Sequence, residues 1–275
     1  MIDLFKYSGA GNDFIVLDGR TENVDKYRDP QTISRLCDRA SGFVAADGRV
    51  GADGLMILTS SQANDFRMEY YNSDGSGGMM CGNGGRCIVA FADQIGVKAA
   101  AKDGVYVFEA ADGLHTGEVL ERNGNDKIVR IKMIDVNGIE PVLDGYFLNT
   151  GTRHYVQYVP DVECIDIDTV GKRIRWDETF APEGANVNFV DQNRKVRTFE
   201  KGVEAETLAC GTGLTACAIA LHHMGLAPSS ADAESGRIRF LLHARRDDLS
   251  VDFIPRKDPF GAESVYLTGP ATWIR

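Results

Sequence analysis

One motif occurs twice in this chain of 275 residues, and it constrains the fold more than any other feature. Cys81-Gly82-Asn83-Gly84 and Cys210-Gly211-Thr212-Gly213 lie 129 positions apart, and a glycine follows each cysteine after fifteen positions, at Gly96 and Gly225. The residues between are almost all apolar, which is typical of a helix buried on every side. The repeat therefore predicts two similar domains, each a curved sheet wrapped around one helix that begins beside its cysteine.

Composition excludes several classes of protein. Hydrophobic residues make up 43% and charged residues 25% of the chain, as in ordinary globular proteins. A net charge of −10 argues against a nucleic-acid or anionic-membrane partner, and no apolar run approaches the ~20 residues of a membrane helix. The N-terminal residues lack the basic and apolar regions of a signal peptide. Six cysteines are too few for a disulfide scaffold and are not spaced as zinc ligands, so we expect free thiols and a cytoplasmic protein.

Hydrophobic periodicity predicts an α/β (α+β) protein in which strands outnumber helices. Helices are expected at 30–40, 86–94 and 214–224. Strands are expected at 4–7, 14–18, 55–59, 66–72, 105–108, 129–133, 146–149, 155–159, 186–190, 196–200, 238–242, 249–254 and 265–268.

The two cysteines are candidates for acid/base chemistry. A cysteine at a helix N-terminus lies beside unsatisfied backbone N–H groups at the positive end of the helix dipole, so the pattern predicts a lowered pKa for each thiol. The glycines let the backbone approach an anion such as a carboxylate. Two such thiols, one from each domain, could remove a proton from one face of a carbon and deliver one to the other face. That is the chemistry of a racemase or epimerase that works without pyridoxal phosphate.

Other interpretations stay open at this point. Cys37, Cys87, Cys164 and Cys217 are expected to be small buried apolar residues. A thiol hydrolase would use one cysteine with His154, and a non-enzymatic module would only bind an amino acid. Phosphate binding is disfavoured because the glycine-rich stretches match no phosphate-binding motif.

The motifs as a set resemble those of the diaminopimelate epimerase family, and they run in order along nearly the whole chain. They are Gly11-Asn12-Asp13-Phe14, Gly51-Ala52-Asp53-Gly54, Asn72-Ser73-Asp74-Gly75, Cys81-Gly82-Asn83-Gly84-Gly85-Arg86-Cys87, Asn186-Val187-Asn188-Phe189, Glu206-Thr207-Leu208-Ala209-Cys210-Gly211-Thr212-Gly213 and Leu267-Thr268-Gly269-Pro270-Ala271.

The resemblance implies a fold and a reaction. The fold has two pseudo-symmetric domains, each a β-barrel-like mixed sheet around a central apolar helix, with the last strand returning to the first domain. We place the N-terminal domain at 1–115 plus 264–275 and the C-terminal domain at 116–263. The reaction interconverts LL- and meso-diaminopimelate in the synthesis of lysine and peptidoglycan precursors, without metal or other cofactor. A related racemase of proline or hydroxyproline is the alternative substrate assignment.

The resemblance also implies roles for individual residues. Cys81 and Cys210 transfer protons, and His154 and Glu200 modulate the pKa of the cysteines and orient the substrate amine. The residues expected to bind substrate are Asn12, Asn72, Gly82, Asn83, Asn186, Glu200, Lys201, Gly211 and Thr212. Without the resemblance, each asparagine would be interpreted as a turn or cap residue and His154 as structural. The expected partner is small-molecule substrate only, with no nucleic acid or membrane, and a homodimer is the assembly under consideration.

The sequence departs from the family pattern at four places. Thr152 and Lys201 stand where an asparagine and an arginine are expected, and Gly54 stands where a glutamine is frequent. One extra residue lies between Glu200 and Cys210. The three substitutions touch substrate recognition rather than the thiols.

Overall fold

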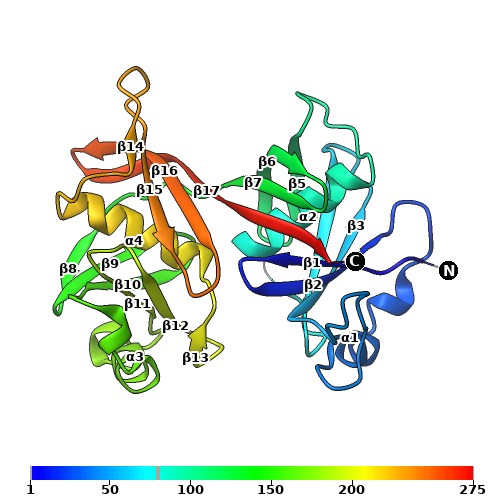
Figure 1. Cartoon of the computed structure of the whole chain (residues 1–275), viewed down its shortest axis with the longest axis horizontal. Helices are drawn as coiled ribbons and strands as arrows, with labels where there is room; N and C mark the ends of the chain where they lie inside the picture. Colours follow the sequence, from blue (N-terminus) through cyan, green and yellow to red (C-terminus); the bar gives the residue numbers. More distant parts are fainter. Residues whose placement is uncertain (1, 79–80, 275) are drawn as a thin grey trace. The chain divides into compact units, whose positions relative to one another are not determined.

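The computed structural model describes residues 2–78 and 81–274, and its chain forms two compact units. Unit 1 comprises Met1–Ile131 and Gly269–Arg275, and unit 2 comprises Lys132–Thr268. Each unit is a mixed, mostly β structure around one central helix (Figure 1), which confirms the predicted fold class. None of the helices in the described ranges is long and apolar enough to cross a membrane.

Eight strands close unit 1 into a ring. β1 pairs with both β2 and β17, and β17 also pairs with β7, so the row from β1 to β7 has no free edge. The strands are β1 (Phe5–Gly9), β2 (Asn12–Asp18), β3 (Gly54–Thr59), β4 (Phe66–Asn72), β5 (Val105–Ala110), β6 (Gly113–Asn123), β7 (Asp126–Lys132) and the end of β17 (Phe260–Ile274).

The core of unit 1 is the helix α2 (Gly82–Gln94). Its residues from Gly82 to Ala92 are all buried, and it contacts β1, β2, β3 and β6. The ring therefore wraps around it, as the apolar run predicted. The helix begins four residues before the predicted Arg86, because the glycines after Cys81 form its first turn. The short helix α1 (Pro30–Cys37) packs against β3.

Unit 2 places its central helix between two sheets. The helix α4 (Gly211–His223) contacts β9 to β12 in one sheet and β15 and β16 in the other. The first sheet has the order β13-β12-β11-β10-β9-β8, and the second continues from β14 to β17. The strands are β8 (Glu140–Val142), β9 (Gly145–Asn149), β10 (Arg153–Tyr158), β11 (Asn186–Val190), β12 (Val196–Glu200), β13 (Ala205–Thr207), β14 (Ser230–Ala231), β15 (Ile238–His243) and β16 (Asp248–Lys257).

The two central helices are equivalent at both ends. Each has 13 residues and a cysteine as its N-cap, Cys81 for α2 and Cys210 for α4. After each helix the chain turns at a glycine with positive φ, Gly96 (69°) or Gly225 (78°). The next N–H donates back into the last turn, from Val97 to Ala92 O and from Leu226 to Leu221 O. The repeat read in the sequence is therefore a repeat of structure.

Some elements were not predicted. They are β6, β8, β13, β14, the helix α3 (Ile167–Arg175), which packs on β11 to β13, and the 3-10 helices Asp25–Tyr27, Val162–Cys164 and Glu178–Phe180. The unit boundaries also differ from 115/116 and 263/264, because β6 and most of β7 belong to the unit 1 ring and β17 leaves unit 2 only after Thr268.

Candidate active site

The first cluster of predicted site residues lies at one end of the unit 1 ring. Asn12 begins β2, Gly54 begins β3 and Asn72 ends β4. Gly54 lies opposite Phe14 in a parallel pair and opposite Asn72 in an antiparallel pair, so all three strand ends coincide. Nδ2 of Asn83 donates to Oδ1 of Asn12 over 2.6 Å, which fixes the N-terminus of α2 at this end.

Cys81 caps α2 with its sulfur. Sγ accepts a hydrogen bond from the Gly84 N–H at 3.2 Å, and the residue is exposed. The side chain of Asn83 serves the protein itself, since it also accepts from Nη2 of the fully buried Arg86 at 2.9 Å. Arg86 donates to the Gly82 carbonyl at 3.2 Å as well. A ligand at this turn would therefore meet backbone N–H groups rather than the Asn83 amide.

Asn12 is held from its other side by charged residues. Its Nδ2 donates to Asp53 at 3.1 Å, and the same carboxylate pairs with Arg39. Arg39 also pairs with Asp13 at 2.6 Å, and Lys6, whose side chain is buried, reaches Asp13 at 2.8 Å. This network leaves little freedom to the asparagine that begins β2.

Asn72 has the geometry of a turn residue. Its Nδ2 donates to Ser76 Oγ at 3.0 Å, and its carbonyl accepts from the Gly75 N–H at 2.9 Å. It lies at the same end of the sheet as Asn12, but its role in substrate binding stays a prediction.

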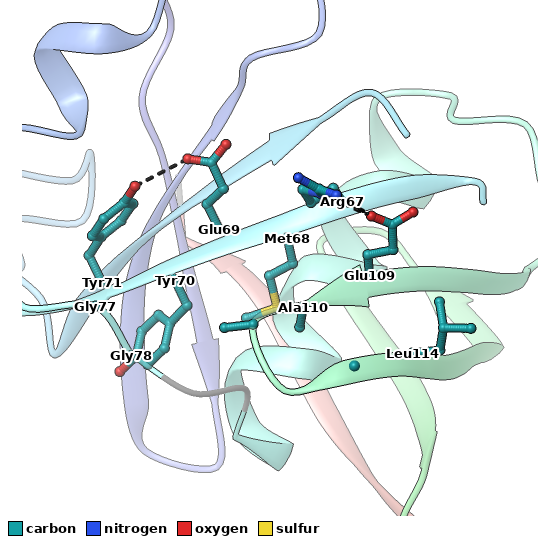
Figure 2. Close-up of a pocket in the computed structure, with 12 residues that line it drawn as sticks. Arg67, Met68, Glu69, Tyr70, Tyr71, Gly77, Gly78, Glu109, Ala110 and Leu114 are labelled. Atoms are coloured by element: carbon teal, nitrogen blue, oxygen red, sulfur yellow. Dashed lines mark hydrogen bonds and ion pairs between the residues drawn. The ribbon is translucent and has the colours of Figure 1, made fainter. Parts of the chain in front are cut away.

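A cavity of about 760 Å³ opens beside β4, and its lining residues Tyr70 and Met68 lie against Gly54 and Gly84. β4 and β5 pair only at Phe66 and Arg67, and beyond that point the strands diverge. Figure 2 shows the lining: Arg67 pairs with Glu109, and the Tyr71 hydroxyl donates to a carboxylate of the same strand. No predicted site residue among the described ones lines this cavity. Its charged groups are already paired, Arg67 with Glu109 and Glu69 with Arg28 outside the lining, so we assign it no chemistry.

The second cluster lies at the N-terminus of α4 in unit 2. His154 of β10 lies opposite Asn186, which begins the parallel strand β11, and Glu200 ends β12. The Thr150 hydroxyl donates to the Thr212 carbonyl at 2.9 Å, which ties the first turn of α4 to the loop before β10. Of the residues that the resemblance grouped with Cys210, Glu200 and Thr212 lie beside its thiol.

The environment of Cys210 corrects one prediction. Burial raises the pKa of this thiol well above its usual value, and the nearby Glu200 carboxylate adds to the effect. Hydrogen bonds from the Thr212 hydroxyl and the Gly213 N–H oppose the rise but do not cancel it. The lowered pKa expected from the helix N-terminus is thus wrong for Cys210, because only 8% of the residue is exposed and desolvation outweighs the helix.

Glu200 shares this buried environment. Burial raises its pKa too, against the lowering effect of hydrogen bonds from Thr207 and from the Cys210 thiol. A thiol that donates to a carboxylate is held in its protonated form. The thiol of Cys210 is therefore favoured over the thiolate in this state.

His154 is completely buried and neutral. Burial lowers its pKa to about 3. Nδ2 of Asn188 lies 3.0 Å from Nδ1 and also donates to the Tyr155 carbonyl at 2.9 Å, while Asn188 Oδ1 accepts from the Thr198 hydroxyl at 3.0 Å. The amide orientation is thereby fixed, so Nδ1 is an acceptor and Nε2 carries the hydrogen.

Because burial disfavours the charged form of His154 in the folded protein, acid should destabilise the fold. The unfolded chain takes up this proton near pH 6.5 and the folded one only near pH 3, so the stability contribution is complete above 6.5 and falls as the pH drops toward 3. Urea unfolding between pH 7 and 4 should show His154→Gln losing stability less steeply than the parent, by up to about 1.4 kcal/mol per pH unit. Equal slopes would contradict the assignment.

Asn186 and Lys201 are joined through the backbone. The Lys201 N–H donates to Asn186 Oδ1 at 2.9 Å, and Asn186 Nδ2 donates to the Arg153 carbonyl at 3.0 Å. The residue Lys201 is exposed.

The remaining cysteines divide into two groups. Cys37, Cys87 and Cys217 are buried as predicted, and burial raises the pKa of each. Cys164 is exposed, which corrects its assignment as a buried residue: it ends the 3-10 helix at Val162–Cys164 on the surface, with Sγ 3.6 Å from Asp161.

Comparison with known proteins identifies the family. The family model for diaminopimelate epimerase matches residues 4–133 and 146–250. The chain belongs to the diaminopimelate epimerase family. A relative named diaminopimelate epimerase from Flavobacterium psychrophilum is 39% identical over 276 aligned positions, covering 98% of this chain and 97% of the relative. Another of that name, from Aquifex aeolicus, is 38% identical and covers 98% of this chain and 94% of its own.

Solved structures agree on the fold. A phenazine biosynthesis protein of the PhzF family from Bacillus anthracis superposes with a TM-score of 0.71, covering 100% of this chain and 97% of its own at 11% identity. A probable proline racemase from Agrobacterium radiobacter gives 0.63, with 98% and 90% coverage at 16% identity. At such identities only the fold is shared.

Two departures from the diaminopimelate epimerase pattern have a structural cause. At Gly54, the Tyr70 ring covers the glycine so closely that a Cβ would lie 2.6 Å from Cε2, so a glutamine has no room. The segment between Glu200 and Cys210, which carries the extra residue, includes the turn between β12 and β13, where Gly202 and Glu204 both have positive φ. The Glu204 N–H closes this turn on the Glu200 carbonyl at 2.8 Å, so the insertion stays outside α4.

Proposed function

We propose that this member of the diaminopimelate epimerase family, an isomerase, interconverts LL- and meso-diaminopimelate by transferring the α-proton between two cysteines. One observation carries the proposal. Cys81 and Cys210 are N-caps at equivalent ends of two equivalent buried helices, and each is followed by a glycine-rich first turn.

Each turnover removes one proton from one face of the α-carbon and adds one proton to the other face. The Cys81 thiolate removes the α-proton from one face, and the Cys210 thiol delivers its proton to the other; in the reverse direction the roles exchange. Cys210 suits the donor role because its buried thiol is held protonated beside Glu200. The first N–H groups of each helix point out of its N-terminus at the positive end of the helix dipole, so we assign them to binding the substrate α-carboxylate and stabilising the carbanion. They belong to Gly82 and Asn83 in α2 and to Gly211 and Thr212 in α4.

The geometry of His154 disfavours the hydrolase alternative. A histidine that activates a cysteine nucleophile must hydrogen-bond to its sulfur. Among the described residues, the two ring nitrogens of His154 are bonded instead to Thr152 and Asn188. The likeness to a probable proline racemase at 16% identity supports a shared fold, whereas a relative at 39% identity is named for diaminopimelate, which favours that substrate.

Incubation with LL-diaminopimelate in deuterated water tests the proposal. We expect meso product that carries deuterium at the inverted carbon from the first turnovers, while recovered LL substrate stays unlabelled, because each face exchanges with its own thiol. Stereochemistry is followed by chiral chromatography and label by mass spectrometry. L-Proline, run in parallel, should neither exchange nor invert. Absence of inversion with diaminopimelate, or inversion of proline instead, would refute the assignment.

The cellular location, the partner and the assembly of the enzyme also belong to the proposal. We place the enzyme in the cytoplasm, where its free thiols would stay reduced, and its partner is the small-molecule substrate. A homodimer remains the proposed assembly, and sedimentation velocity of the reduced protein would test it.

A further inference from the structure

A row of hydrogen bonds in unit 2 connects the buried His154 to the sulfur of Cys210. Nε2 of His154 lies 2.9 Å from Oγ1 of Thr152. Oγ1 of Thr152 donates to Oγ1 of Thr212 at 3.2 Å, and that hydroxyl lies 3.4 Å from Sγ of Cys210. Thr152 is the residue that stands where the family pattern has an asparagine.

The direction of every bond in this row follows from Asn188. Because the Asn188 amide donates to Nδ1, the hydrogen of His154 lies on Nε2 and is donated to Thr152. The Thr152 hydroxyl then has its own hydrogen to donate to Thr212. A hydroxyl has one hydrogen, so the Thr212 hydrogen is left to point at Sγ of Cys210.

We infer that Thr152 is a positioning residue for proton transfer at Cys210: its hydroxyl directs the Thr212 hydroxyl toward the sulfur and so stabilises the thiolate that remains after the thiol has given up its proton. The inference rests on the proposed function, because it assigns Cys210 the role of acid and base. The directions of these hydrogen bonds stay the same across the physiological pH range, since burial lowers the pKa of His154 and keeps its ring neutral.

The opposing influence at the same sulfur is Glu200. Its carboxylate favours the thiol, whereas the hydroxyl of Thr212 and the N–H of Gly213 favour the thiolate. Reversible proton transfer requires that neither form be too stable. Thr152 therefore opposes the effect of Glu200 at this sulfur, because it directs the Thr212 hydroxyl that favours the thiolate.

Thr152→Val keeps the shape of the side chain and removes the hydroxyl. We expect kcat/KM for diaminopimelate to fall about tenfold, because the Thr212 hydroxyl is no longer directed at the thiolate and a hydrogen bond to a charged group contributes about that much. The iodoacetamide labelling rate of Cys210 at pH 8, followed by peptide mass spectrometry, should fall by a similar factor of about ten. Thr152→Ser restores the hydroxyl and should return both values to within about threefold of the parent. Thr116→Val, half-buried on β6 of unit 1, is the matched control for the chemical change.

Other outcomes separate the possible failures. Equal loss in Thr152→Ser and Thr152→Val would mean that shape and not hydrogen bonding matters, and unchanged rates in Thr152→Val would overturn the inference directly. Should Thr152→Val not fold, Thr212→Val breaks the same row and should give both losses, while Thr152→Ser still reports the hydroxyl. The double variant should be no worse than Thr212→Val alone, since the bonds act in series. If Cys210→Ala kept full activity, the proposed function would fail instead; the labelling result does not depend on turnover.

Discussion

Alanine in place of Cys81 or of Cys210 is expected to lower kcat/KM for diaminopimelate by about 100- to 10,000-fold, the contribution typical of a positioned acid or base. Each variant loses one of the two proton carriers, so neither direction of the reaction retains a complete path. Steady-state assays with both isomers measure the loss, and circular dichroism establishes that the variants are folded. Cys164→Ala removes an exposed thiol of unit 2 and should behave like the parent.

Serine variants refine this test. With one thiol left, slow exchange of the α-proton from a single face can continue without inversion, and deuterium incorporation would detect it. Near-normal epimerisation by either alanine variant would refute the two-thiol mechanism.

A methyl group added to Gly213 should be far more damaging than one added to Gly84, although the two glycines occupy the same position in their helices. A Cβ at Gly213 would run into Oδ1 of Asn188, the atom that accepts from Thr198. Because Asn188 is completely buried and also fixes His154, the clash cannot be relieved by rotating a flexible side chain. We expect Gly213→Ala to lose about 2–3 kcal/mol in the free energy of unfolding, measured with urea.

Gly84→Ala is the matched comparison. Its Cβ would meet Sγ of Cys81 and Sδ of Met56 at 3.4 Å, which is ordinary van der Waals contact. Since alanine is the better helix former, this variant should be as stable as the parent or gain up to ~1 kcal/mol. Similar losses at both positions would indicate that the first turns are rigid for a reason other than the Asn188 contact.

The repeat could be predicted because its signals are local. A cysteine before glycines, an apolar stretch and a terminal glycine specify where a buried helix begins and ends. At their C-terminal ends, α2 stops at the predicted Gln94 and α4 stops one residue before the predicted Met224. The helix α3 was missed although Asp166 is its N-cap and Ile167, Val170 and Ile174 have helical spacing. β6 was missed for a different reason, since much of it is polar and exposed, and it is held by pairing with β5 and β7.

The chemistry of the site was less predictable because it depends on burial. The helix N-terminus predicted a lowered pKa at Cys210, but the thiol is buried at the start of a helix that packs on β10, β11 and β12, and that burial depends on tertiary packing. Asn188 went unnoticed as well. It lies two residues after Asn186 on the same strand and so shares its face, and that alternation could have indicated a second polar residue directed toward α4.

The last strand has a consequence for how the protein is made. Residues 269–274 of β17 close the unit 1 ring between β1 and β7. A ribosome synthesises the chain from the N-terminus. While unit 2 is being synthesised, the edges of β1 and β7 that later pair with β17 therefore stay unpaired. Unit 1, which is the first to be synthesised, is therefore the last to complete its sheet.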